Sequence, residues 1–197
     1  MIYLVRHGET EFNVARRHQG HTDSPLTELG RRQARGAARA LAGLVEAQHT
    51  VIFASPLGRA LTTAQIIADT IGITAPIITD ADLKEVRMGS AEGMTEAEMT
   101  ERWPERHPLS AVDSLSFESP DGERLEALST RLRRVLTRVV THDATSRILV
   151  SHGVAGRVLR MLHLDLDPAD AIRLDAPHDV LFRFGAKEVK RIAFEID

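Results

Sequence analysis

The sequence predicts an α/β fold of three layers, α/β/α, with a mainly parallel central sheet and a terminal β-hairpin. Three observations carry this prediction. Short apolar, β-branched runs alternate along the chain with helical patterns, and that order is typical of a parallel sheet covered by helices. The runs lack polar alternation, as expected of strands buried on both faces. The last two runs are separated only by Gly-Ala-Lys, which indicates a hairpin.

The expected strands follow directly from these runs. They cover residues 2–5, 50–54, 76–79, 147–151, 179–184 and 188–194.

The expected helices have start signals and apolar stripes. In residues 55–72, Ser55 is expected to cap the helix, with Pro56 in the first turn and Gly72 at the exit. Residues 26–45 and 119–140 each form a helical pattern, and a short helix is expected at 95–103. Arginines lie opposite the second stripe, where a solvated face is expected. The stripes are Leu29, Ala34, Ala37, Leu41 and Leu44, and then Leu125, Leu128, Leu132, Val135 and Val139.

The length fits one domain over residues 1–197, with no internal repeat or low-complexity linker. Residues 88–119 depart from the alternating pattern and hold the only tryptophan, Trp103, with several prolines. We expect this segment to be a cap-like insertion at one edge of the sheet that influences specificity.

Composition narrows the function. The chain has no cysteine, so disulfides, thiolate-bound zinc and a cysteine nucleophile are excluded. A net charge of -3 and an aromatic content of 4% argue against a nucleic-acid partner. No apolar run reaches the length of a membrane span, and the first residues do not resemble a signal peptide. The prediction is a cytoplasmic protein with no membrane partner.

Charged side chains gather where the predicted strands end. Ligands in open α/β sheets bind outside the carboxyl ends of the strands. The first strand leads into Arg6, His7, Gly8 and Glu9, the second into Arg59, and the strand at 147–151 into His152 and Gly153, while Asp82 and Glu85 follow residues 76–79.

This inventory suits a phosphoryl group. The arginine fork matches phosphate oxygens bidentately, and helix N-termini after Gly8 and after Ser55 are expected to add N–H donors. If Thr10 caps a helix, Asn13 can donate to the same oxygens. A neutral imidazole can attack phosphorus, and a carboxylic acid must then protonate the leaving alcohol. Two guanidinium groups and a cationic His152 could take the place of a metal ion.

Four segments resemble the motif regions of the histidine phosphatase (phosphoglycerate mutase-like) superfamily, in the family's order. They are "LVRHGETEFN", "SPLGRALTTA", "LKEVRMGSAEG" and "LVSHGVAGRVL", and "QGHTDSPLTELGRRQA" resembles a further segment. The resemblance implies a phosphoglycerate mutase-like fold without a cofactor or metal. It implies that His7 is the phosphorylated nucleophile and Glu85 the proton donor. It also implies a phosphate pocket of Arg6, Arg59 and His152 with Asn13 and Gly153, and substrate contacts from Gln19 and Gly20.

The resemblance favours a phosphatase acting on a small phosphorylated metabolite. Relatives with a second arginine have it where this chain has Leu61, and the basic, proline-rich insertion of cofactor-dependent mutases is missing. A mutase and a phospho-ligand-binding module without turnover remain as alternatives. Phosphoglycerates, phosphoserine, a nucleoside phosphate and a phosphoprotein all stay open as substrates, and the terminal hairpin could support a homodimer.

Two alternative interpretations involve a metal ion, and the sequence favours both less than the metal-independent phosphatase. "IITDADLKE" resembles the Asp-x-Asp motif of magnesium-dependent aspartyl phosphatases, but Lys84 stands where a small residue is usual. His18, His21 and Asp23 could form a metal site, although Gly20 makes a shared helical face improbable and a solvated loop is expected. Asp82, Glu9 and Glu92 compete with Glu85 as the proton donor. The histidines at 49, 107, 142, 163 and 178 are expected at the surface or in packing.

Overall fold

The computed structural model describes residues 1–105, 121–171 and 173–196. Within them, six strands form one sheet in the order β3-β2-β4-β1-β5-β6. The first four of these strands pair in parallel, and β5 and β6 add an antiparallel hairpin. The mainly parallel sheet with a terminal hairpin is therefore confirmed. The strands are β1 Ile2–Arg6, β2 Thr50–Ala54, β3 Ile78–Thr79, β4 Ser146–Ser151, β5 Val180–Phe184 and β6 Val189–Ala193.

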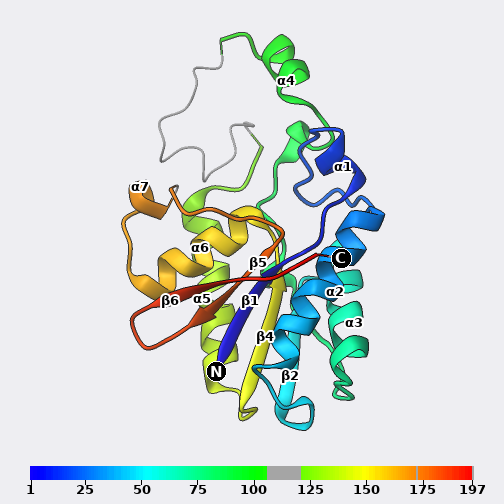
Figure 1. Ribbon diagram of the computed structural model, residues 1–197. Helices are drawn as coiled ribbons and strands as arrows, with labels where there is room; N and C mark the ends of the chain where they lie inside the picture. Colours follow the sequence, from blue (N-terminus) through cyan, green and yellow to red (C-terminus); the bar gives the residue numbers. More distant parts are fainter. Residues whose placement is uncertain (106–120, 172, 197) are drawn as a thin grey trace.

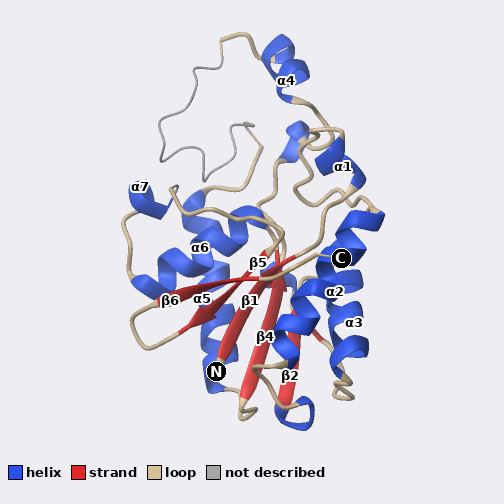
Figure 2. Ribbon diagram, viewed as in Figure 1, coloured by secondary structure: helices blue, strands red, loops and turns tan. Residues whose placement is uncertain are grey.

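Helices cover both faces of the sheet, which confirms the three layers (Figures 1 and 2). The pair α2 and α3 packs on one face, and α5 with α6 on the other. The α-helices of the described residues are α1 Glu11–Val14, α2 Glu28–Ala42, α3 Gly58–Ile71, α4 Glu96–Arg102, α5 Leu125–Thr141, α6 Gly153–Leu164 and α7 Pro168–Ala171.

Side chains of β1 alternate between the two cores. Tyr3 and Val5 pack with residues of α2 and α3, whereas Leu4 packs with residues of α5 and α6. Successive strand side chains point to opposite faces, so a strand that is apolar throughout must be covered twice. The uninterrupted apolar runs of the sequence are thus explained by the two helical layers.

Several element boundaries differ from the prediction. The strand expected at 76–79 contains only Ile78 and Thr79. Helix α2 ends at Ala42, so Leu44 lies beyond it and is 38% exposed instead of joining the buried stripe. Helix α3 begins at Gly58, with Leu57 and not Ser55 as its N-cap residue.

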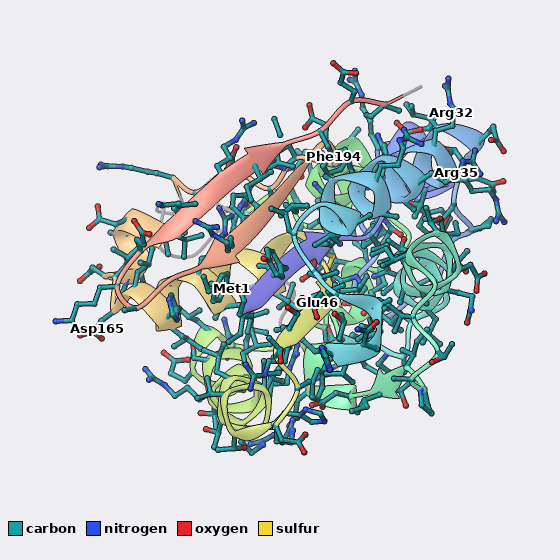
Figure 3. All side chains as sticks on the ribbon, turned by 60° about the horizontal axis from the view of Figure 1, so that its bottom comes forward. Met1, Arg32, Arg35, Glu46, Asp165 and Phe194 are labelled. Atoms are coloured by element: carbon teal, nitrogen blue, oxygen red, sulfur yellow. The ribbon has the colours of Figure 1, made fainter. Side chains whose placement is uncertain are left out.

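The segment after β6 folds back over α2. Phe194 packs against the core between the sheet and α2, and Figure 3 shows it beside that helix. A Cβ at Gly36 of α2 would lie only 2.9 Å from the Phe194 ring, so the glycine makes this contact possible. The outer strand β6 is thereby held to the helical layer.

Helices α1 and α4 lie beyond the carboxyl ends of the parallel strands (Figure 1). Thr10 caps α1, and a capping box formed by Thr95 and Glu98 begins α4. The expected insertion at 88–119 is described as far as residue 105, and its remaining residues lie outside the described part of the chain. None of the described helices is long and apolar enough to span a membrane.

Candidate active site

A cavity of about 170 Å³ opens at the carboxyl end of β1, between α1, α3 and the segment after β3. Most of the predicted site residues line it. His152 and Gly153 lie next to the lining residues, since the His152 ring is 5.1 Å from that of His7 and a Cβ at Gly153 would contact the Arg6 guanidinium. The lining residues are Arg6, His7, Asn13, Arg17, His18, Gln19, Gly20, Arg59, Glu85 and Met88.

His7 is fixed at the end of β1 in a defined tautomer. Its backbone N–H donates to Ser151 O of the neighbouring strand at 3.0 Å. Its Nδ1 lies 2.7 Å from Gly8 O, and because a carbonyl oxygen only accepts, Nδ1 must carry the proton. In the neutral ring, Nε2 therefore holds a free lone pair, as nucleophilic attack requires.

The environment of His7 favours that neutral ring. Burial is the main cause that lowers the pKa of His7 well below its usual value, and the Arg6 and Arg59 charges lower the pKa further. The His7 ring is thus neutral at neutral pH.

Gly8 is required by close packing against α2. A Cβ at this position would lie 2.1 Å from the carbonyl oxygen of Gly30. The Gly8 N–H donates to Thr63 Oγ1 of α3 at 3.1 Å. The strand end is therefore held between two helices, which fixes the direction of His7.

Arg59 binds the loop before α2 through Nη1 and Nη2, and its buried Nε has no hydrogen-bond partner among the described residues. Nη1 donates to Thr22 O at 2.9 Å and to Asp23 Oδ1 at 3.2 Å, and Nη2 donates to Gly20 O at 2.8 Å. Nε and the second Nη2 hydrogen can therefore meet two oxygens of an anion, in the bidentate arrangement that phosphate favours.

Arg6 has a similar arrangement. One Nη1 hydrogen bonds the carbonyl of Ala176, while the buried Nε has no partner among the described residues. Burial lowers the pKa of Arg6 to about 10, so the guanidinium stays charged at neutral pH. The nearby Glu85 carboxylate offsets part of the cost of burying this charge, and a phosphoryl dianion would offset more of it.

The N-terminus of α3 is already occupied by a carboxylate. Asp23 Oδ2 accepts from Gly58 N–H at 2.5 Å, and Oδ1 accepts from Arg59 N–H at 3.3 Å. The expectation that this helix end, after Ser55, supplies donors to phosphate is therefore wrong. Asp23 completes the helix start that lacks a side-chain cap of its own.

Ser55 instead orients His152. Ser55 Oγ accepts from Leu57 N–H at 3.3 Å and lies 2.8 Å from His152 Nε2, so its hydroxyl can donate to that nitrogen. If the hydroxyl donates, the proton of the neutral ring lies on Nδ1, which is buried and has no partner among the described residues. Burial, followed by the Arg59 charge, lowers the pKa of His152 well below its usual value, which favours the neutral ring. A cationic His152 beside a phosphoryl group stays a prediction.

Glu85 faces the cavity and is 8% exposed. Its Oε1 accepts from Val86 N–H at 3.0 Å and Ala155 N–H at 2.9 Å, and Oε2 accepts from Val154 N–H at 3.1 Å. The carboxyl group thus lies at the N-terminus of α6, and it lines the same cavity as His7.

The competing carboxylates are engaged elsewhere. Asp82 pairs with Arg134 and Arg138 of α5. Glu9 Oε1 accepts from the Thr27 hydroxyl at 2.8 Å. Glu92 accepts from the backbone N–H groups of residues 21, 22 and 88. Glu85 alone among these four candidates lines the cavity.

The expected substrate-contact residues also line the cavity; they are Asn13, Gln19 and Gly20. Gly20 has a φ of +53°, and a Cβ there would meet the Glu92 carboxylate at 2.4 Å, so glycine is needed. Gln19 is buried, with an Oε1 that lacks a partner in the described structure. Asn13 Oδ1 accepts from Thr10 N–H at 3.0 Å, which leaves the Asn13 amide hydrogens available to a ligand.

Sequence reasoning missed His178 and Arg17. The His178 Nδ1 donates to His7 O at 2.8 Å, which ties the β5 side of the site to the nucleophile. Burial, aided by the Arg6 charge, lowers the pKa of His178 to about 4. Arg17 lies at the cavity mouth and forms a bidentate pair with Glu98 of α4. Neither residue belongs to a motif or a strand end, so no local pattern pointed to it.

The loop histidines form no metal cluster in the described residues. His21 Nε2 donates to Glu85 O at 2.9 Å, whereas Asp23 binds the α3 N-terminus and Arg59. His18 lies 3.4 Å from Glu96. The three side chains thus have separate partners, and the loop belongs to the scaffold of the cavity.

Comparisons with known proteins agree with this geometry. "Probable phosphoglycerate mutase GpmB" of Yersinia pestis is 40% identical over 178 residues, covering 87% of this chain and 78% of that protein. The solved structure of Bacillus stearothermophilus YhfR aligns with a TM-score of 0.78 at 29% identity, covering 99% of this chain and 94% of the other. A mycobacterial glucosyl-3-phosphoglycerate phosphatase solved with VO3 has the same fold, with a TM-score of 0.81 at 24% identity over 100% and 98% of the two chains. The family model of the histidine phosphatase superfamily (branch 1) matches residues 2–187, and this chain belongs to that superfamily.

Proposed function

We propose that the protein is a metal-independent phosphatase that hydrolyses a small phosphomonoester through a phosphohistidine on His7. The observation that carries the proposal is the free Nε2 of a neutral His7 beside two guanidinium groups with unpartnered Nε atoms. A nucleophile next to donors for non-bridging phosphoryl oxygens is the arrangement that phosphoryl transfer needs.

The reaction has two steps. His7 Nε2 attacks phosphorus and the P–O bond to the leaving alcohol breaks, while protonated Glu85 gives its proton to the departing oxygen. A water molecule then attacks the phosphohistidine, Glu85 takes a proton from it, and the P–N bond breaks to release phosphate. Arg6, Arg59 and the Nδ1–H of His152 bind the non-bridging oxygens in both steps, so the substrate phosphate and the charge of the transition state are both stabilised.

The cavity mouth supports hydrolysis over mutase activity. A phosphoglycerate mutase must hold a second acidic group of its substrate or primer. Here Arg17 is bound to Glu98 and to Gly93 O, and His18 lies beside Glu96. Glu98 of α4 thus neutralises the Arg17 cation, which would otherwise attract a second anionic group. A volume of about 170 Å³ also favours a small leaving alcohol.

The name of the Yersinia relative favours the alternative, a phosphoglycerate mutase. Incubation with 3-phosphoglycerate and a bisphosphorylated primer separates the two activities. We expect free phosphate to form faster than the isomer, with or without excess chelator. Faster isomer formation would support the mutase, and loss of turnover in chelator would contradict metal independence. Tight binding of phosphate esters with neither product would indicate a binding module.

A phosphatase screen over the open substrate classes then identifies the substrate. Phosphoglycerates, phosphoserine, nucleoside phosphates and a phosphopeptide are compared by free phosphate released. The ranking by kcat/KM distinguishes esters with an uncharged body from those with a second acidic group.

A further inference from the structure

Every guanidinium N–H of Arg131 in α5 donates a hydrogen bond, either to the Glu123 carboxylate or to one of three backbone carbonyl groups. Nε and Nη2 bind the two oxygens of Glu123, each at 2.7 Å. Nη1 donates to Asp82 O at 2.6 Å and to Lys84 O at 2.7 Å, and Nη2 also donates to Glu85 O at 2.8 Å. The five donors of a planar guanidinium are thereby all satisfied, which fixes the group rigidly.

The three carbonyl groups belong to the segment that carries the proton donor. Asp82 lies in a single 3₁₀ turn over Ala81–Leu83, whereas residues 84–88 form neither a helix nor a strand, so no regular ladder holds Lys84 and Glu85. The Glu85 carbonyl also accepts from His21 Nε2 at 2.9 Å, and the Ser151 hydroxyl donates to Leu83 O at 2.9 Å. The Glu85 backbone is thus held chiefly by side chains from other elements.

Glu123 fixes the Arg131 guanidinium through a bidentate ion pair. Its side chain is 13% exposed and that of Arg131 is 12% exposed, so the pair is largely shielded from water. Glu123 N–H donates to Arg87 O at 2.7 Å, and Arg87 N–H donates to Glu123 Oε2 at 3.2 Å. The start of α5 and residues 82–87 therefore form one connected unit.

The arginine-rich side of α5 is the exposed face that the sequence predicted at Arg133, Arg134 and Arg138, and Arg131 is the exception. Arg134 and Arg138 bind the carboxylates of Asp82 and Asp80 at the surface. Arg131 is the member of the row that reaches the Glu85 backbone.

We propose that Arg131, locked by Glu123, is a positioning residue that sets the distance between the Glu85 carboxyl group and the leaving oxygen. The proposal rests on the function proposed above, in which Glu85 donates the proton. The carboxyl group is anchored to α6 and its backbone to α5, so loss of the second anchor lets the donor shift. A displacement near 1 Å can lower the rate about 10²-fold.

The test compares Arg131→Met with Arg134→Met as the matched control. Methionine keeps the length and helix propensity of the side chain and removes the donors. For each variant, kcat/KM is measured on an alkyl phosphate and on p-nitrophenyl phosphate, whose leaving group needs little protonation. We expect Arg131→Met to lose about tenfold more on the alkyl ester, a part of the roughly 10²–10⁴-fold that a general acid contributes. Arg134→Met should leave both values near wild type.

Glu85→Gln separates the proposal from the proposed function. If the wild type hydrolyses neither ester, or Glu85→Gln loses both activities equally, the role of Glu85 itself is wrong. If Glu85→Gln is selective for the alkyl ester but Arg131→Met lowers both activities equally or neither, the positioning role is wrong.

A second variant covers loss of folding. Thermal unfolding shows whether Arg131→Met is folded, and Arg131→Lys keeps the charge but loses the planar fork. Arg131→Lys should also lose more kcat/KM on the alkyl ester than on p-nitrophenyl phosphate, but the difference should be smaller than for Arg131→Met. A folded Arg131→Lys protein with equal losses on both esters would overturn the proposal.

Discussion

At the residue scale, the site depends on a balance of protonation states. His7 and His152 lie among arginines, and burial lowers the pKa of both rings. A neutral His7 can attack, and a neutral His152 can still donate from Nδ1 when the Ser55 hydroxyl donates to its Nε2. The pocket therefore obtains its positive charge from the guanidinium groups of Arg6 and Arg59.

The protonation of His7 can be measured directly. We expect its ring signals in NMR to stay those of the neutral, Nδ1–H tautomer at pH 6.5, where an unperturbed histidine is about half protonated. Comparison with the His7→Gln variant assigns the signals. A His7 that is already half protonated at pH 6.5 would contradict the account.

The same shifts predict the pH dependence of stability. Folded His7, His152 and His178 hold lowered pKa values, so below about pH 6.5 the unfolded chain binds protons that the folded chain does not. We expect the free energy of unfolding, measured in urea, to fall as the pH drops from 7 to 5. His178→Gln should weaken this dependence, since the pKa of His178 is about 4. Equal slopes in the two proteins would contradict the assignment.

At the element scale, a helix end that the sequence assigned to substrate is part of the scaffold. The N-terminus of α3 binds Asp23, and Arg59 in its first turn binds the carbonyls of Gly20 and Thr22. Both contacts join α3 to the loop that forms one wall of the cavity. This helix end therefore joins α3 to the loop, and its N–H groups bind Asp23 and not a substrate.

Substitution of Asp23 tests that role. Asp23→Ala removes the carboxylate from the helix start, and we expect a loss of about 1 kcal/mol of stability, the usual cost of a lost cap. Asp23→Asn keeps an acceptor and should lose less. Thermal unfolding measures both, with Asp143→Ala as the control because that side chain is fully exposed. An Asp23→Ala protein as stable as the wild type would show that α3 does not need this contact.

At the scale of the whole molecule, the sequence predicted what strands and their ends dictate. Apolar runs located the strands, and the rule for strand ends located Arg6, His7 and His152, because Arg6 ends β1, His7 follows it, and His152 follows β4. Sequence patterns could not predict contacts between residues that are distant in the chain. Leu44 was misplaced because Gly43 ends α2 early, and His178 and Arg131 act through backbone carbonyls that no spacing reveals.

The competition among carboxylates was also a question of the whole fold. Four acids stood near the expected site in the sequence, and the structure distinguishes them by their partners. Asp82 binds the arginines of α5, while Glu85 turns inward to the start of α6. Residues 82 and 85 are only three apart, so tertiary packing and not local sequence decides which one faces the cavity.

The central claim is that His7 carries the phosphoryl group during turnover, and trapping it is the most direct test. The enzyme is mixed with a ³²P-labelled phosphomonoester that it hydrolyses and is quenched in alkali, which preserves phosphohistidine. We expect acid-labile label on the peptide that contains His7 and no label on His7→Ala, which should still bind phosphate through Arg6 and Arg59. Label on a serine or aspartate, or hydrolysis by His7→Ala at a rate near wild type, would contradict the account.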